Sequence, residues 1–362
     1  MIHVYGCRIS YYTGKLESYL RFRSIPYDQL PTEPHRRRIL AGAGAVQMPV
    51  VELEDGRWLS DSTPTIAWFE SRQAAPSIYP EDPALRFAAL LLEDYADEWL
   101  WRPAMHYRWS FRQDRQYASW AIVDEVLPHV RLPRPVKRWM VTRRQLGGFV
   151  RGDGVSDATR GHVEQSYRNA LDRLEAIFGQ RRFLLGDQPT IADFGFMGPM
   201  LRHFGQDPTP QEIMRRRAPG VYAWVARMWN TRAADVEPEL VPELDAPLSA
   251  LLREACETHL VQLRENAAAY GRGLGRYDQV VQGCRYENVP CSRYRVWCLE
   301  ELRREWAGID DGARATLRRH LPEPAAAVLW DGSPVAPSGY DRERRAPFHR
   351  AINVFGRGVP PR

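Results

Sequence analysis

The chain has 362 residues, 44% hydrophobic and 11% aromatic, which is enough to fill a large core and to form two or three domains. Its 50 Lys and Arg residues are nearly balanced by 45 Asp and Glu residues, so the net charge of +5 provides no strong field for nucleic acid. No run reaches the roughly 18 apolar residues of a membrane helix, and the N-terminus lacks a secretion-signal pattern. We therefore expect a soluble cytoplasmic protein that has no nucleic-acid or membrane partner.

The cysteines argue against a secreted disulfide framework, because their number is odd and the chain is long. Thiolate metal sites need paired short spacings, whereas three of these cysteines are spaced by seven residues. We expect reduced thiols and no metal site. The five residues are Cys7, Cys256, Cys284, Cys291 and Cys298.

The first part of the chain alternates strand and helix patterns. A β-branched and aromatic run at residues 2–5 indicates a buried strand. Apolar residues recur at helical spacing over residues 16–22, and Pro26 ends that helix because a proline biases the preceding residue away from helical backbone. The pattern continues with a strand at residues 27–30 and a helix at residues 34–40.

Two strands and a helix complete this unit. Strands at residues 49–53 and 57–60 are separated by an Asp-Gly turn signal, which predicts a hairpin. Asp61 or Ser62 then caps the next helix. In this order the elements form a thioredoxin-like α/β domain, which we assign to residues 1–75, because the proline, the acidic turn and the helix N-terminus converge on one point.

A proline-rich linker at residues 73–83 precedes a long helical region. The first amphipathic stretch is one helix or two joined near Pro103. Thr190 and Asp193 form the pattern of an N-terminal capping box, which we interpret as purely structural. We predict an all-helical domain over residues 82–235. Helical spacing recurs at residues 85–112, 161–178 and 219–229.

The remaining residues, 236–362, form an additional α+β section to which the sequence assigns no role. Helical patterns cover residues 248–270 and 293–306, and a hairpin is predicted at residues 277–289. The basic tail at residues 340–362 is rich in Pro and Gly, and we expect it to be a solvated end.

The order of elements and the register of one serine resemble the glutathione transferase superfamily. Ser10 lies fifteen positions before Ile25. In serine and cysteine types of that family, the catalytic residue lies at this distance before the isoleucine that follows the first helix. The resemblance covers residues 1 to roughly 235 and points to a serine-type, bacterial-like member with a long C-terminal extension.

The resemblance implies roles for two dipeptides. Pro49 matches the family's cis-proline, and the preceding Met48 would offer its backbone to the cysteinyl part of glutathione. Asp61 and Ser62 match the acidic residue and the serine that hold the γ-glutamyl end. Glutathione is then a cosubstrate, and relatives of this kind are usually symmetric homodimers.

Thiol chemistry explains the serine. A thiol has a pKa of about 8.5, and only its thiolate attacks an electrophile. The Ser10 hydroxyl, at a helix N-terminus, would donate to sulfur and lower the thiol pKa by roughly one to two units. The alternative is that Ser10 merely caps the helix. Tyr11 and Tyr12, which we also predict to bind glutathione, could donate to sulfur instead, as could Tyr5.

A crowd of aromatic residues in the first long helix offers a surface for a flat apolar electrophile. From it we predict that Tyr95, Trp99 and His106 contact the second substrate. The alternative is core packing at helical spacing, which accounts for many of these aromatic residues. Acidic residues at positions 93–98 are interpreted as a solvated face rather than as metal ligands.

The resulting hypothesis is a glutathione transferase-like enzyme that directs the glutathione thiolate at a small hydrophobic electrophile. Two alternatives remain open. Cys7 could carry glutathione-dependent thiol-disulfide reduction through a mixed disulfide, although a free cysteine is more often a buried hydrophobic residue. The fold could also serve as a non-catalytic binding protein.

Overall fold

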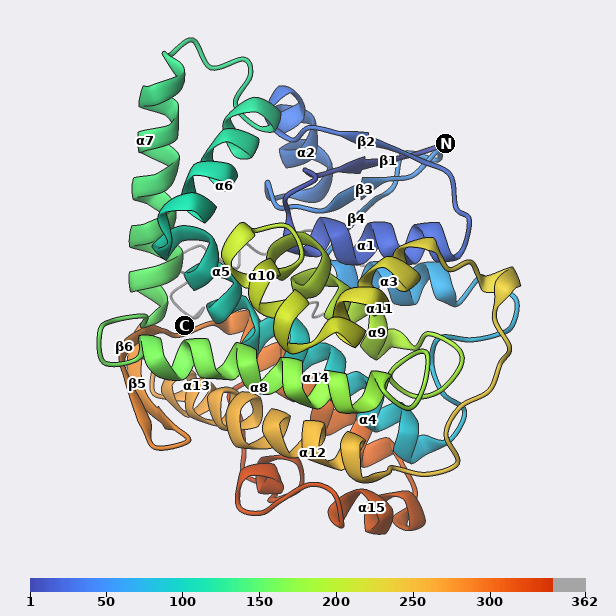
Figure 1. Ribbon diagram of the computed structural model, residues 1–362. Coiled ribbons are helices and arrows are strands. Elements are labelled where there is room, and N and C mark those ends of the chain that lie inside the picture. Colours follow the sequence, from blue (N-terminus) through green and yellow to red (C-terminus); the bar gives the residue numbers. More distant parts are fainter. Residues whose placement is uncertain (341–362) are drawn as a thin grey trace.

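The computed structural model describes residues 1–340 of the chain (Figure 1). Its N-terminal part is a small mixed sheet with helices on both faces, which confirms the predicted thioredoxin-like arrangement. The strands lie in the order β2-β1-β3-β4, with β1 parallel to β2 and the other two pairs antiparallel. The elements are β1 (Ile2–Tyr5), α1 (Tyr11–Phe22), β2 (Tyr27–Leu30), α2 (Arg36–Ala43), β3 (Val50–Glu52), β4 (Trp58–Ser60) and α3 (Ser62–Glu70).

The strand register brings three chain segments to one edge of the sheet. Tyr5 at the end of β1 pairs with Val50 at the start of β3, and Val50 pairs with Ser60 at the end of β4. The segments that follow β1, precede β3 and follow β4 therefore lie close together. This edge is the place where the sequence predicted that they would converge.

The second part is all-helical, as predicted. The first long stretch is two helices, and Pro103 lies in the first turn of the second, where a proline removes no internal helix bond. The helices α6, α7 and α10 were not predicted. The elements are α4 (Pro83–Asp94), a π-helical turn (Tyr95–Trp99), α5 (Trp101–Ser110), α6 (Arg112–Glu125), α7 (Arg134–Gln145), α8 (Arg160–Phe178), α9 (Ile191–Pro199), α10 (Pro208–Arg217) and α11 (Pro219–Asn230).

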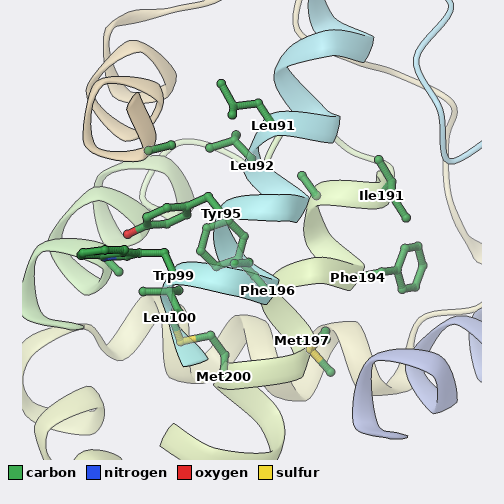
Figure 2. Close-up of a cluster of buried hydrophobic side chains, with 14 of the residues drawn as sticks. Leu91, Leu92, Tyr95, Trp99, Leu100, Ile191, Phe194, Phe196, Met197 and Met200 are labelled. Atoms are coloured by element: carbon green, nitrogen blue, oxygen red, sulfur yellow. The ribbon is translucent and has the colours of Figure 1, made fainter. Parts of the chain in front are cut away.

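Helix α9 lies at the centre of the core, between α1 and α4. Two glycines allow the close approach: a Cβ on Gly195 would lie 2.8 Å from the Glu93 Cα, and one on Gly198 would lie 2.8 Å from the Tyr11 ring. The predicted capping box is confirmed, since Asp193 accepts a hydrogen bond from the Thr190 backbone at 2.9 Å. Figure 2 shows Phe196 lying between α9 and α4, whereas Ile191 and Phe194 point away from α4, and Phe194 packs against Tyr19 and Phe22 of α1.

The C-terminal section packs against the helical part: α12 lies against α8 and α4, and α14 and α15 lie against α4. Figure 1 shows this section on the side of the molecule away from the sheet. The predicted hairpin is confirmed, with its turn at Gly283. The elements are α12 (Ala246–Ala255), a π-helical turn (Cys256–Leu260), α13 (Val261–Gly271), β5 (Arg276–Val281), β6 (Cys284–Pro290), α14 (Arg293–Gly308) and α15 (Asp311–Arg318).

Buried ion pairs join the C-terminal section to the helical part. Arg295 on α14 lies 3.2 Å from Glu98 and 3.9 Å from Asp153. His259 lies 2.7 Å from Asp94 on α4. Because buried charges are costly without partners, these contacts make the attachment of the section specific.

Helices long and apolar enough to cross a membrane are not found among residues 1–340. The basic tail discussed in the sequence analysis begins at the last described residue, Tyr340, and otherwise lies outside the described residues.

Candidate functional site

Three of the sequence-predicted positions meet at the sheet edge described above. Ser10 follows β1 and is the N-cap of α1, the Met48–Pro49 bond before β3 is cis, and Asp61 follows β4 as the N-cap of α3. The loops touch each other, since the Cys7 Sγ lies 3.6 Å from the Met48 Sδ. The N-termini of two helices, with their partly unpaired backbone N–H groups, therefore face one small region.

Ser10 is partly exposed and held firmly by its loop. Its backbone N–H donates to the Cys7 carbonyl at 3.0 Å, and its hydroxyl oxygen accepts from the Thr13 N–H at 3.4 Å. The buried Arg108 donates to the Ile9 carbonyl at 2.7 Å. A hydroxyl that accepts at an N-cap keeps its hydrogen for donation, so capping and thiolate stabilisation are compatible roles for Ser10.

Asp61 adopts a backbone conformation that is uncommon for a residue with a side chain, with φ at +70°. Outliers of this kind cluster at binding sites, where the surrounding structure holds them. The carboxylate accepts from the Thr63 N–H at 3.3 Å, and Tyr294 of α14 lies beside it. Burial raises the pKa of Asp61 to about 6, although the Tyr294 hydroxyl and the Lys15 charge act in the opposite direction. Ser62, the next residue, is buried.

A fully buried lysine supports this region from behind. Lys15 on α1 donates to the Thr63 hydroxyl at 2.8 Å and pairs with both Glu93 and Asp97. Burial alone would lower the pKa of Lys15, but the charges of Asp97 and Glu93 raise it overall. The network ties α1 to the start of α3 and to the α4 region, and so fixes the spacing between Ser10 and Asp61.

The tyrosine hydroxyls proposed as alternative sulfur donors are already used. Tyr11 is buried and donates to the Ala96 carbonyl, and Tyr12 donates to the Asp97 carbonyl at 3.0 Å. Tyr5 donates to Glu52 at 2.7 Å on the other side of the sheet. These contacts favour Ser10 over the tyrosines as the donor to sulfur, and they favour a packing role for Tyr11.

The three predicted electrophile contacts lie in the protein interior. Tyr95 and Trp99 project from the π-helical turn and are buried (Figure 2). The Trp99 ring centroid lies 6.3 Å from that of His162 on α8 and 6.4 Å from that of Tyr286 on β6. His106 is also buried, 3.2 Å from the Glu164 carboxylate and 2.9 Å from the Ser110 hydroxyl. This placement favours the alternative of core packing over contact with an electrophile.

Of the residues that border the site on its helical side, sequence reasoning named Tyr12 but assigned no role in the site to Trp101, Phe149, Tyr294 or Trp297. The Tyr12 and Trp101 rings stack at 5.7 Å, and Phe149 meets Trp101 edge-on at 6.0 Å. All three are half-buried. Tyr294 and Trp297 of α14 pack together at 5.3 Å beside Asp61. Trp101 belongs to the aromatic crowd noted in the sequence, but nothing local distinguishes it from its buried neighbours.

Cys7 is buried beside the site, and burial raises the pKa of its thiol to about 12. A thiol that stays protonated is a poor nucleophile. Among residues 1–340 no group of three or more His, Cys, Asp or Glu side chains is arranged to hold a metal ion.

Comparison with known proteins identifies two domains. Residues 4–77 match the N-terminal domain of glutathione S-transferases, and residues 153–227 match the C-terminal domain of the same family. A comparison with curated proteins found no match.

Several solved structures are similar at low sequence identity. A beta-etherase from a Sphingobium species is 16% identical, with a TM-score of 0.45, over 63% of this chain and 94% of that chain. The isozyme E7 glutathione S-transferase of Drosophila melanogaster is 16% identical, with a TM-score of 0.41, over 63% of this chain and 86% of that chain. A glutathione S-transferase from Methylobacillus flagellatus with GSH bound is 14% identical, with a TM-score of 0.38, over 69% of this chain and 98% of that chain.

The two domain matches agree with the architecture, in which a thioredoxin-like sheet precedes an all-helical domain. Two segments of the chain, residues 4–77 and residues 153–227, are therefore similar to the two domains of glutathione S-transferases.

Proposed function

We propose that the chain is a glutathione-dependent transferase that activates the glutathione thiol for attack on a small hydrophobic electrophile. The observation that carries this proposal is the meeting of Ser10, the cis Met48–Pro49 bond and Asp61 at one sheet edge. We further propose residues 1–75 as the glutathione-binding domain and residues 82–235 as the substrate domain, in a cytoplasmic homodimer.

Each residue has a chemical task in this proposal. Ser10 donates to the sulfur, and the N-terminus of α1 adds positive potential, so that the thiolate is favoured at neutral pH. Met48 and Pro49 align the peptide backbone. Asp61 pairs with the γ-glutamyl ammonium, with Ser62 beside it. Charge pairing at a partly buried site is stronger than in water, which suits recognition of a zwitterionic end.

The electrophile would meet the thiolate on the side of the stacked rings. Tyr12, Trp101 and Phe149 supply half-buried apolar area beside the N-terminus of α1. Aromatic faces suit a planar apolar substrate. Tyr95, Trp99 and His106, which are packed in the core, would act by supporting this wall.

Calorimetric titration of the full chain with glutathione tests the proposal. We expect saturable binding with one site per chain and a loss of at least about tenfold in affinity when Asp61 is replaced by Asn. Absence of binding at millimolar glutathione would contradict the proposal and favour a non-catalytic binding role for the fold.

The thiol-disulfide alternative is tested separately. If Cys7 reacted with glutathione, the protein would gain the mass of one glutathione on incubation with its disulfide, and a Cys7→Ser variant would not. Because the thiol is buried with its pKa raised to about 12, we expect no such adduct under native conditions.

A further inference from the structure

The α6–α7 hairpin carries an unusual concentration of exposed apolar side chains. Figure 1 shows these two helices projecting at one side of the molecule, beside the N-terminal sheet. Twelve large hydrophobic residues are exposed among residues 1–340, and seven of them lie within residues 117–140. They are Tyr117, Trp120, Val130, Leu132, Val136, Trp139 and Met140.

On α7 large apolar side chains are exposed and a lysine is buried, which is the reverse of the usual arrangement. Val136, Trp139 and Met140 are spaced three and four residues apart, which places them on one helical face, and Trp139 is 59% and Met140 48% exposed. The buried positions are Val141 and Lys137, whose ammonium donates to the Leu127 carbonyl at 2.8 Å. The apolar stripe of α7 therefore faces solvent, and such faces mark interaction sites.

The same hairpin holds an excess of positive charge equal to that of the whole chain. Residues 112–145 contain eight Lys and Arg against three Asp and Glu, whereas the complete chain has a net charge of +5. The cations border the aromatic rings: the Arg138 guanidinium lies 4.5 Å from the Trp120 ring centroid, and that of Arg143 lies 5.4 Å from the Trp139 ring centroid.

A shallow hollow of about 260 Å³ lies between the two helices, and its lining includes both arginines and an aromatic side chain. Arg115, Arg138 and Trp139 are among the residues that line it. Apolar and aromatic side chains flanked by arginines are the composition of interfacial helices that lie on lipid surfaces.

Charge decides between the possible occupants. A second copy meeting the hairpin through a two-fold contact would bring two surfaces of like charge together, which is unfavourable. Nucleic acid would pair with the arginines but would leave Val136, Met140 and Leu132 exposed. An anionic lipid surface complements both the charge and the apolar stripe.

We propose that the α6–α7 hairpin docks the protein onto an anionic lipid surface, with Trp139 and Met140 entering the interfacial layer. A surface contact of this kind needs no spanning helix. It departs from the expectation of no membrane partner, and it is independent of the proposed glutathione chemistry.

Co-sedimentation of the full chain with vesicles tests the proposal. The probes are vesicles of phosphatidylcholine alone and of phosphatidylcholine mixed with phosphatidylglycerol. We expect at least about tenfold tighter binding to the anionic vesicles. Binding should weaken as salt rises, since the charge contacts are exposed. Equal binding to both vesicles, or no binding to either, would overturn the proposal.

Two pairs of variants locate the contact. Trp139→Ser with Met140→Ser should reduce vesicle binding at least about tenfold, because serine has little apolar area to bury in the lipid. Tyr222→Ser with Leu274→Ser, also exposed but outside the hairpin, should leave it unchanged. For charge, Arg143→Glu with Arg144→Glu should weaken binding, whereas Arg215→Glu with Arg216→Glu on α10 should not.

Light scattering on the same variants separates the remaining occupants. If the Trp139 and Met140 substitutions change the oligomeric state and leave vesicle binding as in the original chain, the face is a contact between copies and the lipid proposal fails. An unchanged circular dichroism spectrum and unchanged glutathione binding would establish that a loss of vesicle binding does not come from unfolding.

Discussion

The hydroxyl of Tyr294, at the start of α14, lies beside the carboxylate of Asp61, at the start of α3, and lowers the pKa of that carboxylate. One residue belongs to the thioredoxin-like domain and the other to the C-terminal section. The residue proposed to hold the γ-glutamyl ammonium is therefore tuned by a part of the chain outside the two matched glutathione S-transferase domains.

Replacement of Tyr294 by Phe should make glutathione binding more sensitive to pH. Loss of the Tyr294 hydroxyl, which lowers the Asp61 pKa, should raise that pKa above its present value of about 6. For a shift of about one unit, affinity at pH 6 falls about fivefold, whereas affinity at pH 8 changes little. Calorimetry at both values measures this. Tyr270→Phe, on α13 of the same section, is the matched control, and tighter binding by Tyr294→Phe would instead identify Tyr294 as a competitor of glutathione.

Asp61 itself should impose a pH dependence on glutathione binding. Burial raises its pKa from 3.8 to about 6, so the carboxylate that pairs with an ammonium is lost as pH falls through about 6. Affinity should decline over that window in the original chain and stay low and flat in Asp61→Asn. Titration from pH 5 to pH 8 tests this, and a parallel decline in both proteins would contradict it.

The same shift predicts a stability effect of known sign. A folded-state pKa above the unfolded value means that the native state binds the proton more tightly, so stability falls as pH rises from 3.8 to about 6. Asp61→Asn removes this contribution. Urea denaturation of both proteins across that window should show a smaller decrease for the variant.

Ser10→Ala should lower kcat/KM with a model electrophile at least about tenfold, which corresponds to about 1.4 kcal/mol in the barrier. The rate falls because the variant stabilises the thiolate less well. The pKa of bound glutathione, measured by the ultraviolet absorbance of the thiolate, should therefore rise.

Ser10→Gly separates catalysis from capping. Glycine is tolerated at an N-cap at a cost of only a few tenths of a kcal/mol, yet it has no hydroxyl. We expect near-original stability with activity as low as in Ser10→Ala. Ser10→Thr, which keeps the hydroxyl, should retain more activity than either, and full activity in Ser10→Gly would remove the hydroxyl from the mechanism.

Lys15→Met should destabilise the fold by about 3–5 kcal/mol, because Glu93 and Asp97 would remain buried without their cation. Burial raises the pKa of Asp97, so the deficit should shrink as pH falls and this carboxyl binds a proton. Urea denaturation measures the change.

An exposed pair provides the control for Lys15. Arg217→Met breaks the contact with Asp172 on the surface and should change stability by less than about 1 kcal/mol. If both variants lost the same free energy of unfolding, the buried network around Lys15 would contribute no more to stability than the surface pair does.

Local signals made much of the N-terminal site predictable. Ser10 as a cap, the proline at residue 49 and the turn at Asp61 each depend on a few neighbouring residues, and the structure brings these positions to one sheet edge. The contact between Asp61 and Tyr294 depends on how a distant helix docks, and no short pattern records that.

Periodicity could not separate core from site in the helical part. Tyr95 and Trp99 share the spacing of the other aromatic residues in this stretch, and they become buried only when α9 packs beside Tyr95 and when α8 and β6 pack beside Trp99. Helices α6 and α7 were missed for a related reason. Lys137 is turned inward while Trp139 faces solvent, which is the opposite of the pattern by which amphipathic helices are found.

The bridge that Arg295 forms to Glu98 and Asp153 limits how this protein can be dissected. A chain shortened to its first 235 residues would leave Glu98 without this cation, and burial already raises the pKa of Glu98 to about 7. Asp153 would keep a cation, because the Arg102 Nε lies 3.1 Å from it. Such a fragment would also expose the faces of α4 and α8 that the C-terminal section covers, and so would be prone to precipitate. A substitution of Arg295 or of Glu98 alone therefore leaves a buried charge without its partner, so the two positions should change together.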